Sequence, residues 1–204
     1  LNPETGTTDI EKLRAIIADS GSKAACLVFT QTNCLGNLEE VDVLTDIAHE
    51  AGLNAIACVD PILYGDGGLK PPVAFGKKGA DIMVGEGQHL AIAPNFGGPG
   101  LGIFGIRFND ENKNAIRSTA GRYVGAARDL NGTDCKVMVL STREQHIRKE
   151  KATSNICSNQ SFVATLAGAG ILARGAEGLQ KLAKELPARA RTLARRLCAI
   201  PGVR

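Results

Sequence analysis

The segment from Asp81 to Gly105 constrains the fold most, because it combines two short apolar runs with a loop of high glycine content. The first apolar run ends at Val84, and the second covers residues 103–106. Four glycines lie within six residues between these runs: Gly97, Gly98, Gly100 and Gly102. Because glycine lacks a Cβ, this backbone can adopt positive φ angles and approach a bound group closely. The pattern predicts a ligand loop at the edge of a buried sheet, and alone it is only a weak indication of phosphate binding.

Two further apolar runs have the length of buried strands and enclose a helical pattern. Residues 24–30 and 54–59 are almost continuously apolar, as expected where both faces of a parallel strand are covered. Between them, apolar residues recur at helical spacing over 41–51, with Asn37 as the expected cap and Gly52 as the expected stop. A first helix is predicted at about 9–18. This order predicts a βαβ crossover within an α/β fold.

The second half of the chain predicts a hairpin and then helices. Asn131 and Gly132 are a strong turn signal between strands expected at 125–130 and 136–140. Residues 109–114 predict a short capped helix before this hairpin. Beyond it, residues rich in alanine and glycine predict a helix at 160–174. Leucines at helical spacing predict a longer helix at 178–197, which we expect Pro187 to interrupt.

The composition is typical of one soluble α/β domain, since 204 residues that are 44% hydrophobic and 22% charged can bury a sizeable core. A net charge of +3, from intermixed basic and acidic residues, argues against nucleic-acid binding. Six cysteines form no CxxC pair, and four lie in apolar runs, which predicts buried free thiols in a reducing cytoplasm. We expect no membrane span, because no apolar run approaches roughly 18 residues. The three histidines follow no metal-ligand spacing, so no metal site is predicted.

Three stretches carry a resemblance to a known family: DPILYGDGGLKPP at Asp60–Pro72, the segment Asp81–Gly105, and TREQHIRKEKATSNIC within Ser141–Gln160. They resemble the glycine cleavage system P protein, the decarboxylating glycine dehydrogenase, and more narrowly its alpha-type half, subunit 1. The resemblance implies a partial large domain of the fold type I, aspartate-aminotransferase-like transferases, which depend on pyridoxal phosphate (PLP). We expect this large domain at residues 1–186. Residues 187–204 are then expected to form a linking helix towards a C-terminal small domain, with the chain as a central piece of a longer protein.

The resemblance gives particular importance to Gln88. In the beta-type half of the family, the lysine that forms the Schiff base with PLP lies opposite this residue, and a carboxamide cannot form the imine. The resemblance therefore implies that this chain has no catalytic residue of its own and that a beta-type partner subunit holds the PLP. The implied reaction decarboxylates glycine and passes the aminomethyl group to the lipoyl arm of the H protein. We expect this chain to be the alpha subunit that completes and supports that site, inactive in isolation.

Two further positions are candidates for contact with the cofactor. Asp60 ends a predicted strand at the place where related fold type I enzymes pair a carboxylate with the ring nitrogen of PLP. The alternative, which we favour, is an aspartate that caps the following turn and is only a vestige of the ring-nitrogen position. Thr153, supported by Asn155, lies in a segment whose form in related enzymes donates to the phosphate of the partner's PLP. Glu86 and His89 flank Gln88, and we expect them to form hydrogen bonds within the pocket rather than to transfer protons.

Two alternative functions stay open at this level. A free-standing PLP enzyme would need another lysine, and Lys70 is the rival for the imine. Its position before two prolines, upstream of the strand that should carry such a lysine, argues for a solvated or interface residue instead. The other alternative is a catalytically silent binding or regulatory module whose glycine loop holds some other anion. Imine trapping distinguishes the first alternative, and activity on mixing with a lysine-bearing partner distinguishes the second.

Overall fold

The computed structural model describes residues 1–20, 23–110, 112–116, 123–139, 150 and 158–203. These residues form two compact units: Leu1–Arg107 together with Phe162–Arg204, and Phe108–Ser161. The expected boundary between a large domain at 1–186 and a linking helix at 187–204 concerns a longer protein, and it stays a prediction.

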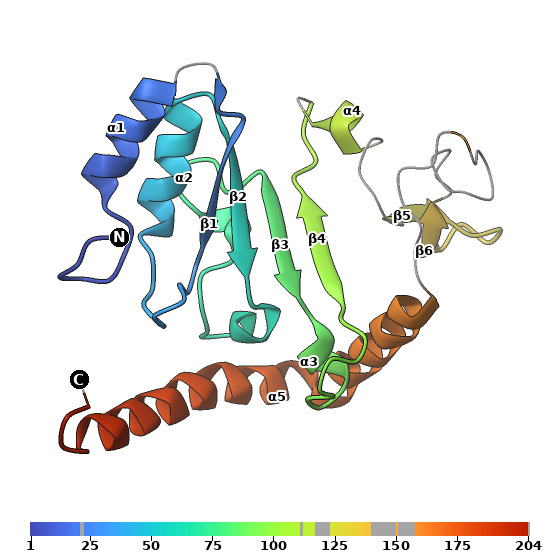
Figure 1. Ribbon diagram of the computed structural model, residues 1–204. Helices are drawn as coiled ribbons and strands as arrows, with labels where there is room; N and C mark the ends of the chain where they lie inside the picture. Colours follow the sequence, from blue (N-terminus) through green and yellow to red (C-terminus); the bar gives the residue numbers. More distant parts are fainter. Residues whose placement is uncertain (21–22, 111, 117–122, 140–149, 151–157, 204) are drawn as a thin grey trace. The chain divides into compact units, whose positions relative to one another are not determined.

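The first unit is built on a four-stranded sheet in the order β1-β2-β3-β4 (Figure 1). Its strands are β1 (Cys26–Thr30), β2 (Asn54–Val59), β3 (Ile82–Glu86) and β4 (Gly102–Ile106). The first three strands are parallel, and β4 runs antiparallel to β3. The carboxyl ends of β1, β2 and β3 therefore meet at one edge of the sheet. The predicted α/β fold, with a helix between two parallel strands, is confirmed.

Helices α1 (Ile10–Ser20) and α2 (Val41–Glu50) supply the packing against this sheet. The core contains one face of β1 and β2 together with the apolar stripe of α2, in which Leu44 and Ala48 are almost fully buried. Phe75, which follows the short 3-10 helix η3 (Pro72–Ala74), is also fully buried and stacks at a tilt on Phe29 of β1. Burial of this apolar surface is the main stabilising term of the unit.

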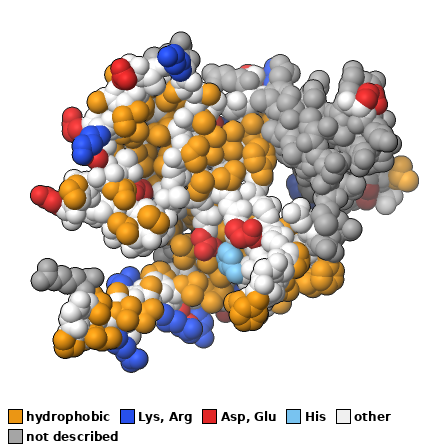
Figure 2. Space-filling model, in the orientation of Figure 1, with side chains coloured by type: hydrophobic (Ala, Val, Ile, Leu, Met, Phe, Trp, Pro, Cys, Tyr) orange, Lys and Arg blue, Asp and Glu red, His pale blue; other side chains and the backbone are white. Residues whose placement is uncertain are grey.

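The opposite face of the sheet is not covered by the described residues, which corrects the expectation of strands buried on both sides. Val28 of β1 is 56% exposed and Phe104 of β4 is 44% exposed. Hydrophobic side chains gather over the strands on this face (Figure 2). The cause is the alternation of side chains along a strand, which places Phe29 in the core and its neighbours outside it. An almost continuously apolar run in the sequence cannot reveal which of its two faces is covered.

The same alternation corrects the prediction for the cysteines. The five described cysteines are free thiols, as expected, but none of them is buried. Cys26 is exposed and Cys58 is half-buried, because both belong to the open face of the sheet. Cys34 and Cys198 are exposed, and Cys135 is half-buried.

The turn signals around α2 are correct at one end and wrong at the other. Gly52 adopts a φ of 70° directly after the helix, as predicted for its stop. Asn37 does not cap the helix, because its side-chain amide donates to the carbonyl of Thr5. The residue at the cap position is Glu40, which makes no side-chain cap hydrogen bond.

The long helix α5 (Ser158–Cys198) contains one break, at Gly175, where φ is 63° and ψ is −176°. The break separates the two predicted helices at 160–174 and 178–197. The predicted interruption at Pro187 is wrong, because the helix continues on both sides of this residue. Proline removes one helical hydrogen bond, and packing of α5 on the rest of the unit, for example at the buried Ala183, offsets that loss.

One segment of the described chain, Gln160–Cys198 in α5, is long and apolar enough to cross a membrane by length and composition alone. Its most apolar window has a mean hydropathy of 1.2, and 11% of that window is buried. No such segment was expected from the amino-acid sequence. One helix of this kind is weak evidence for a membrane span, because helices of soluble proteins pass the same test.

The second unit contains the predicted hairpin. Strands β5 (Tyr123–Arg128) and β6 (Asp134–Val139) pair antiparallel. In the turn, Gly132 has a φ of 79°, and the carboxylate of Asp129 accepts from the backbone N–H groups of Asn131 and Thr133. A short helix, α4 (Lys113–Ile116), follows Asn109, whose side chain accepts from the N–H of Asn112 as a cap. The expected hairpin and short capped helix are confirmed.

Candidate functional site

The carboxyl ends of the three parallel strands form the candidate site. Thr30 lies opposite Cys58, and Cys58 lies opposite Val84, so the strands end in register. Two residues after these three positions, the sequence has Thr32, Asp60 and Glu86. These polar side chains, together with His89, line a cavity of about 580 Å³. Ligands of open α/β sheets bind at this edge, where loops follow the strands.

Asp60 and His89 form the central pair of this cavity. His89 Nε2 lies 2.9 Å from Asp60 Oδ1. Asp60 also caps the 3-10 helix η2 (Pro61–Tyr64), since the same Oδ1 accepts from the N–H of Ile62 at 3.1 Å. The capping role that we favoured for Asp60 is therefore present, and its ring-nitrogen role stays a prediction. Asp60 is 50% and His89 36% exposed, so water reaches both.

Gln88 begins the short helix α3 (Gln88–Ala91), directly after β3. Its side-chain nitrogen donates to the carbonyls of Ala93 at 3.0 Å and Ile92 at 3.3 Å. The carboxamide therefore fastens the end of its own short helix. Both donor hydrogens of the Gln88 amide are used within this turn, so the residue stabilises the loop in which the family comparison would place a reactive amine.

The carboxylate of Glu86 holds the glycine loop in place through backbone hydrogen bonds. Its Oε1 accepts from the backbone N–H of Leu101 at 2.7 Å and from that of Gln88 at 2.8 Å. The hydrogen bond from Leu101 is the main cause that lowers the pKa of Glu86, so the carboxylate is ionised at neutral pH. A negative charge thus already lies against the loop. This geometry disfavours the alternative in which the glycine loop holds an external anion.

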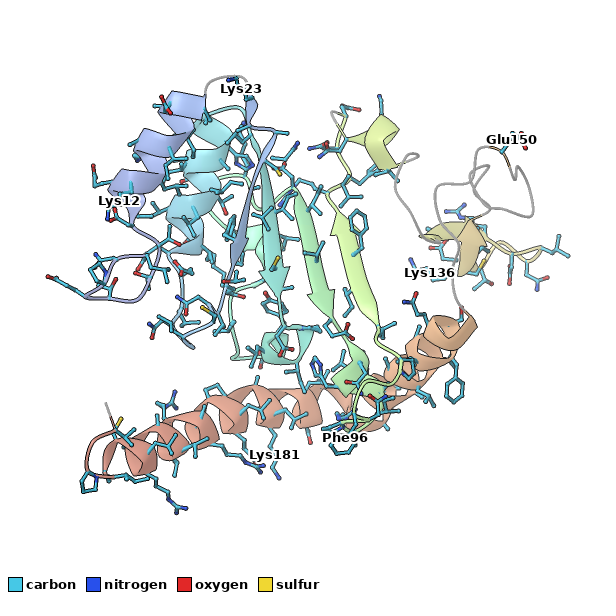
Figure 3. The ribbon with its side chains drawn as sticks, viewed as in Figure 1. Lys12, Lys23, Phe96, Lys136, Glu150 and Lys181 are labelled. Carbon is cyan, nitrogen blue, oxygen red and sulfur yellow. The ribbon has the colours of Figure 1, made fainter. Side chains whose placement is uncertain are left out.

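The glycine loop uses the conformational freedom of glycine at one position. Among its four glycines only Gly97 has a positive φ, of 96°. Phe96 precedes it with a φ of 53° and a fully exposed ring that lies near α3 (Figure 3). At Gly98 a Cβ would lie 2.4 Å from the side chain of Asn95, whose Oδ1 accepts from the N–H of Gly98. The loop is organised by its own hydrogen bonds.

Lys70 lies away from this cavity. Its Nζ forms an ion pair with both carboxylate oxygens of Asp42 in α2, at 2.7 and 2.8 Å. Lys70 Nζ is thus engaged by Asp42 and is not free to attack a carbonyl. Lys70 is absent from the residues that line the cavity of Asp60 and His89. The structure therefore places the rival lysine where an imine is disfavoured.

The residues at this edge do not fit PLP bound in this chain. No lysine of the described residues lines the cavity, Gln88 stands where the resemblance predicts a Schiff-base lysine in the other half of the family, and Asp60 Oδ1 is already engaged by His89. Two carboxylates, Asp60 and Glu86, line the cavity, and no lysine or arginine of the described residues lines it, so it is poorly suited to a ligand with a phosphate dianion. Thr153 and Asn155, the predicted donors to a partner's PLP, lie outside the described residues.

Three residues that line this cavity were not predicted from the sequence: Thr30, Thr32 and Cys58. A signal was present in the spacing, because Thr30 and Thr32, like Cys58 and Asp60, are two residues apart and so share one face of the strand and its continuation. The strand ends were predicted, but the face of the sheet that stays open was not.

Residues 4–201 match the sequence profile of the family described as "Glycine cleavage system P-protein". A curated relative from Chlorobium luteolum, named probable glycine dehydrogenase (decarboxylating) subunit 1, is 43% identical over 199 residues, which is 98% of this chain and 42% of the relative. Relatives of the same name from Moorella thermoacetica and Nitrosomonas europaea are 40% and 39% identical, over 98% and 100% of this chain and 42% and 43% of their own length. The chain thus spans less than half the length of the curated relatives it matches.

A crystal structure of glycine decarboxylase (P-protein) of the glycine cleavage system, in inhibitor-bound form, matches with a TM-score of 0.74 and 36% identity, over 89% of this chain and 39% of that chain. Mouse CSAD in apo form matches with a TM-score of 0.61 at 15% identity, over 98% of this chain and 38% of that chain, which shows a likeness of fold alone. These matches confirm the predicted fold class, a partial α/β large domain of the fold type I PLP-dependent transferases. Because the family profile covers nearly the whole chain and the subunit 1 relatives align along it, this chain belongs to the glycine cleavage system P-protein family.

Proposed function

We propose that this chain is part of the alpha-type, non-lysine subunit of a glycine dehydrogenase (decarboxylating) in the glycine cleavage system. The parent enzyme would release CO2 from glycine and transfer the remaining aminomethyl group to the lipoyl arm of the H protein. The names of the curated relatives support this assignment, and the designation "subunit 1" implies a separate second subunit. In this proposal the PLP and its lysine belong to that second, beta-type subunit.

One observation carries the proposal: the amide of Gln88 lies directly after β3, and it is satisfied by the carbonyls of Ile92 and Ala93. The amide can form no imine, and its hydrogen bonds give it a structural use in a chain that does not hold the cofactor covalently. The hydrogen-bonded cavity of Asp60, Glu86 and His89 agrees with a site that has lost its cofactor.

We propose that this chain contributes to the partner's site from its own surface. Thr153, supported by Asn155, would donate a hydrogen bond to the phosphate of the PLP held by the beta-type subunit. PLP, when bound in the partner, supplies the electron sink for decarboxylation. The alpha-type chain would position that cofactor and complete the assembly, while glycine and the lipoylated H protein meet the reacting atoms in the partner.

Reconstitution tests the proposal. Purified alpha-type protein, beta-type partner and an equimolar mixture are each incubated with PLP, carboxyl-labelled glycine and lipoylated H protein, and release of labelled CO2 is measured. We expect no release by the alpha-type protein alone, and at least about tenfold more from the mixture than from the partner alone. Comparable release by the alpha-type protein alone would contradict the proposal.

Two variants make this experiment sharper. Thr153→Ala should lower the activity of the mixture and weaken retention of PLP by the complex, whereas Thr133→Ala, in the β5–β6 turn, is the control and should change neither. Gln88→Lys tests the alternative of an enzyme that needs only a lysine. We expect it to remain inactive alone, because the cavity would still be lined by the carboxylates of Asp60 and Glu86, which are engaged by His89 and Leu101.

Imine trapping addresses Lys70 separately. Borohydride reduction of the alpha-type protein with PLP, followed by peptide mapping, should give no stoichiometric label on Lys70, since Asp42 holds its ammonium. A specific label there would favour the free-standing enzyme.

We also propose a cytoplasmic location, which the exposed free thiols of Cys26, Cys34 and Cys198 support, because such thiols persist in reducing compartments.

A further inference from the structure

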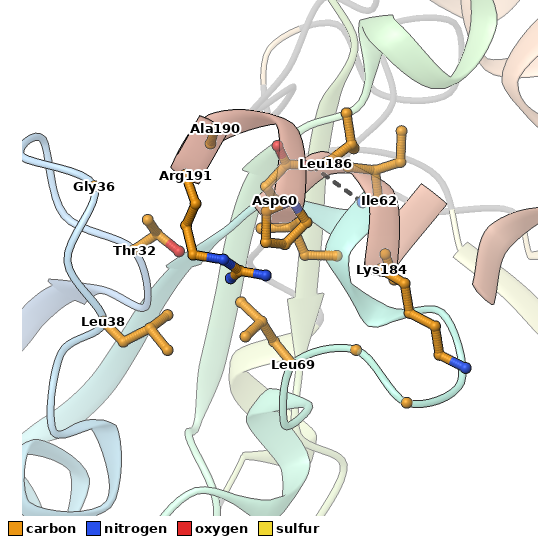
Figure 4. Close-up of a pocket in the computed structure, with 15 residues that line it drawn as sticks. Thr32, Gly36, Leu38, Asp60, Ile62, Leu69, Lys184, Leu186, Ala190 and Arg191 are labelled. Atoms are coloured by element: carbon orange, nitrogen blue, oxygen red, sulfur yellow. Dashed lines mark hydrogen bonds between the residues drawn. The ribbon is translucent and has the colours of Figure 1, made fainter. Parts of the chain in front are cut away.

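A second cavity, of about 770 Å³, lies between the loops that follow β1 and β2 and the C-terminal half of α5 (Figure 4). Its volume is in the range of cavities that bind small molecules, roughly 300–1,000 Å³. Leu38 and Leu69 form its wall on the loop side, and Leu186 contributes from the helix. This cavity shares Asp60 and Thr32 with the candidate site, but Gln88, Glu86 and His89 do not line it.

Arg191 is the main charged group in this cavity. Its side chain leaves α5 and extends between Leu38, Leu69 and Asp60 (Figure 4). Among the described residues, no carboxylate forms an ion pair with Arg191. A guanidinium group presents several N–H donors in a plane, which suits the two oxygens of a carboxylate or phosphate.

Lys184 stands at the rim of the same cavity, also without an acidic partner in the described part of the chain. It precedes Arg191 by seven residues, which places both cations on one face of the helix. Two other basic residues of α5, Lys181 and Arg189, pair instead with Glu185, at 3.7 and 2.9 Å. Lys181 points away from the sheet (Figure 3).

Asp60, the one acidic group among the described residues that line this cavity, is already engaged. Asp60 contacts His89 at 2.9 Å and accepts from the N–H of Ile62. Arg191 therefore lies beside one engaged carboxylate, and Lys184 stands at the rim; neither cation has an acidic partner among the described residues (Figure 4). This charge balance favours an anionic head group, and the leucine walls favour an apolar body attached to it.

We propose that the cavity binds a small amphiphilic anion, with a carboxylate or phosphate head on an apolar body. Arg191 holds the head group, Lys184 attracts it from the rim, and the body lies on Leu38, Leu69 and Leu186. The site adjoins the cavity of Asp60 and His89, with which it shares Asp60 and Thr32, and it does not depend on the function proposed above.

Matched probes test the head group and the body separately. Binding of hexanoate, hexyl phosphate and 1-hexanol to the purified protein is followed by NMR chemical-shift titration of backbone amides. We expect saturable shifts at Leu69 and Arg191, with at least one anion binding about tenfold or more tightly than hexanol. If hexyl phosphate is the tighter anion, the natural ligand is a phosphate ester; if hexanoate is tighter, it is a carboxylate. Absence of saturable shifts, or equal binding of all three probes, would overturn the proposal.

Two arginines on the same helix provide a matched pair of variants. Arg191→Ala should weaken binding of the preferred anion by about tenfold and leave hexanol unchanged. Arg189→Ala removes the same charge from the face that pairs with Glu185, and it should change anion binding by less than about twofold. Lys184→Ala should give a smaller loss than Arg191→Ala. An equal loss in the Arg189 and Arg191 variants would show that only the general charge of α5 matters, which contradicts a built site.

Discussion

Two histidine–aspartate pairs mark the two ends of the parallel sheet, and their surroundings differ. At the amino end, His49 of α2 contacts Asp81 at 3.0 Å, just before β3. At the carboxyl end, His89 contacts Asp60 at 2.9 Å. The side chains of the first pair are 16% and 17% exposed, and those of the second are 36% and 50% exposed. The two contact distances are thus nearly equal, although the first pair is mostly buried and the second is exposed to solvent.

The difference separates a structural contact from a candidate binding site. Asp81 Oδ2 accepts from His49 and also from the N–H of Ala55 at 2.8 Å, so it ties α2, β2 and the start of β3 together. His49 Nδ1 is buried without a hydrogen-bond partner among the described residues. Asp60 and His89 instead face a cavity and solvent. Burial makes the first pair expensive to break, whereas water can replace the second.

Removing Asp81 should have the largest effect on stability. Asp81→Ala leaves the N–H of Ala55 and the ring of His49 without their acceptor in a mostly buried place, and we expect a loss of about 3 kcal/mol in the free energy of unfolding. Urea denaturation measures it. The matched control is Asp60→Ala at the solvent-exposed carboxyl end of the sheet, for which we expect a loss below about 1 kcal/mol. Equal losses would contradict the comparison.

Tyr64 shows that burial, rather than position at the amino or the carboxyl end of the sheet, decides how much a contact contributes to stability. Its hydroxyl donates to Gln31 Oε1 at 2.6 Å near the carboxyl end, and burial, assisted by the charge of Asp60, raises its pKa. We expect Tyr64→Phe to cost about 1 kcal/mol of unfolding free energy. A double-mutant cycle with Gln31→Ala isolates this contact, and a coupling energy near zero would count against our interpretation.

The lowered pKa of Glu86 predicts that local stability at the carboxyl end of the sheet depends on pH. Its pKa is lowered first by the hydrogen bond from Leu101 and further by that from Gln88. A lowered folded pKa means that the stabilisation is fully present above the ordinary value of 4.5 and is lost as the pH falls through the folded value. Protection of the Leu101 amide from hydrogen exchange should follow this course. In Glu86→Gln the protection should not change over the same acidic range, and a persistent pH dependence would assign it to another group.

The smallest effect is expected for His89. His89→Ala should change the free energy of unfolding by less than about 0.5 kcal/mol, because its contact with Asp60 is solvated. His49→Ala is the matched comparison, and it should cost clearly more because it leaves Asp81 with one fewer donor in a buried place. Thermal unfolding of both variants under one condition measures the difference. A larger loss in His89→Ala would reverse the roles assigned to the two ends.

Much of the secondary structure could be predicted, because its signals are local. The run at 54–59 forms β2 with the predicted bounds, the Asn131 and Gly132 turn forms the hairpin, and Gly175 separates the two predicted helices. Predictions that depended on surroundings failed. Asn37 donates to Thr5 instead of capping α2, and Pro187 does not interrupt α5. In each case a contact with another segment outweighed a local preference.

For the candidate site, too, some features could be predicted from the sequence and others depend on the tertiary structure. The amino-acid sequence was sufficient for the family, for the α/β fold class and for Gln88 as a residue that cannot form an imine, because these depend on residue identity and local pattern. Only the tertiary structure joins His89 to Asp60, Lys70 to Asp42, and Glu86 to Leu101. These partners are 29, 28 and 15 residues apart, and no periodicity links positions at such separations. Which face of the sheet stays open likewise depends on where the helices pack, and that is decided by burial of the whole unit rather than by any one segment.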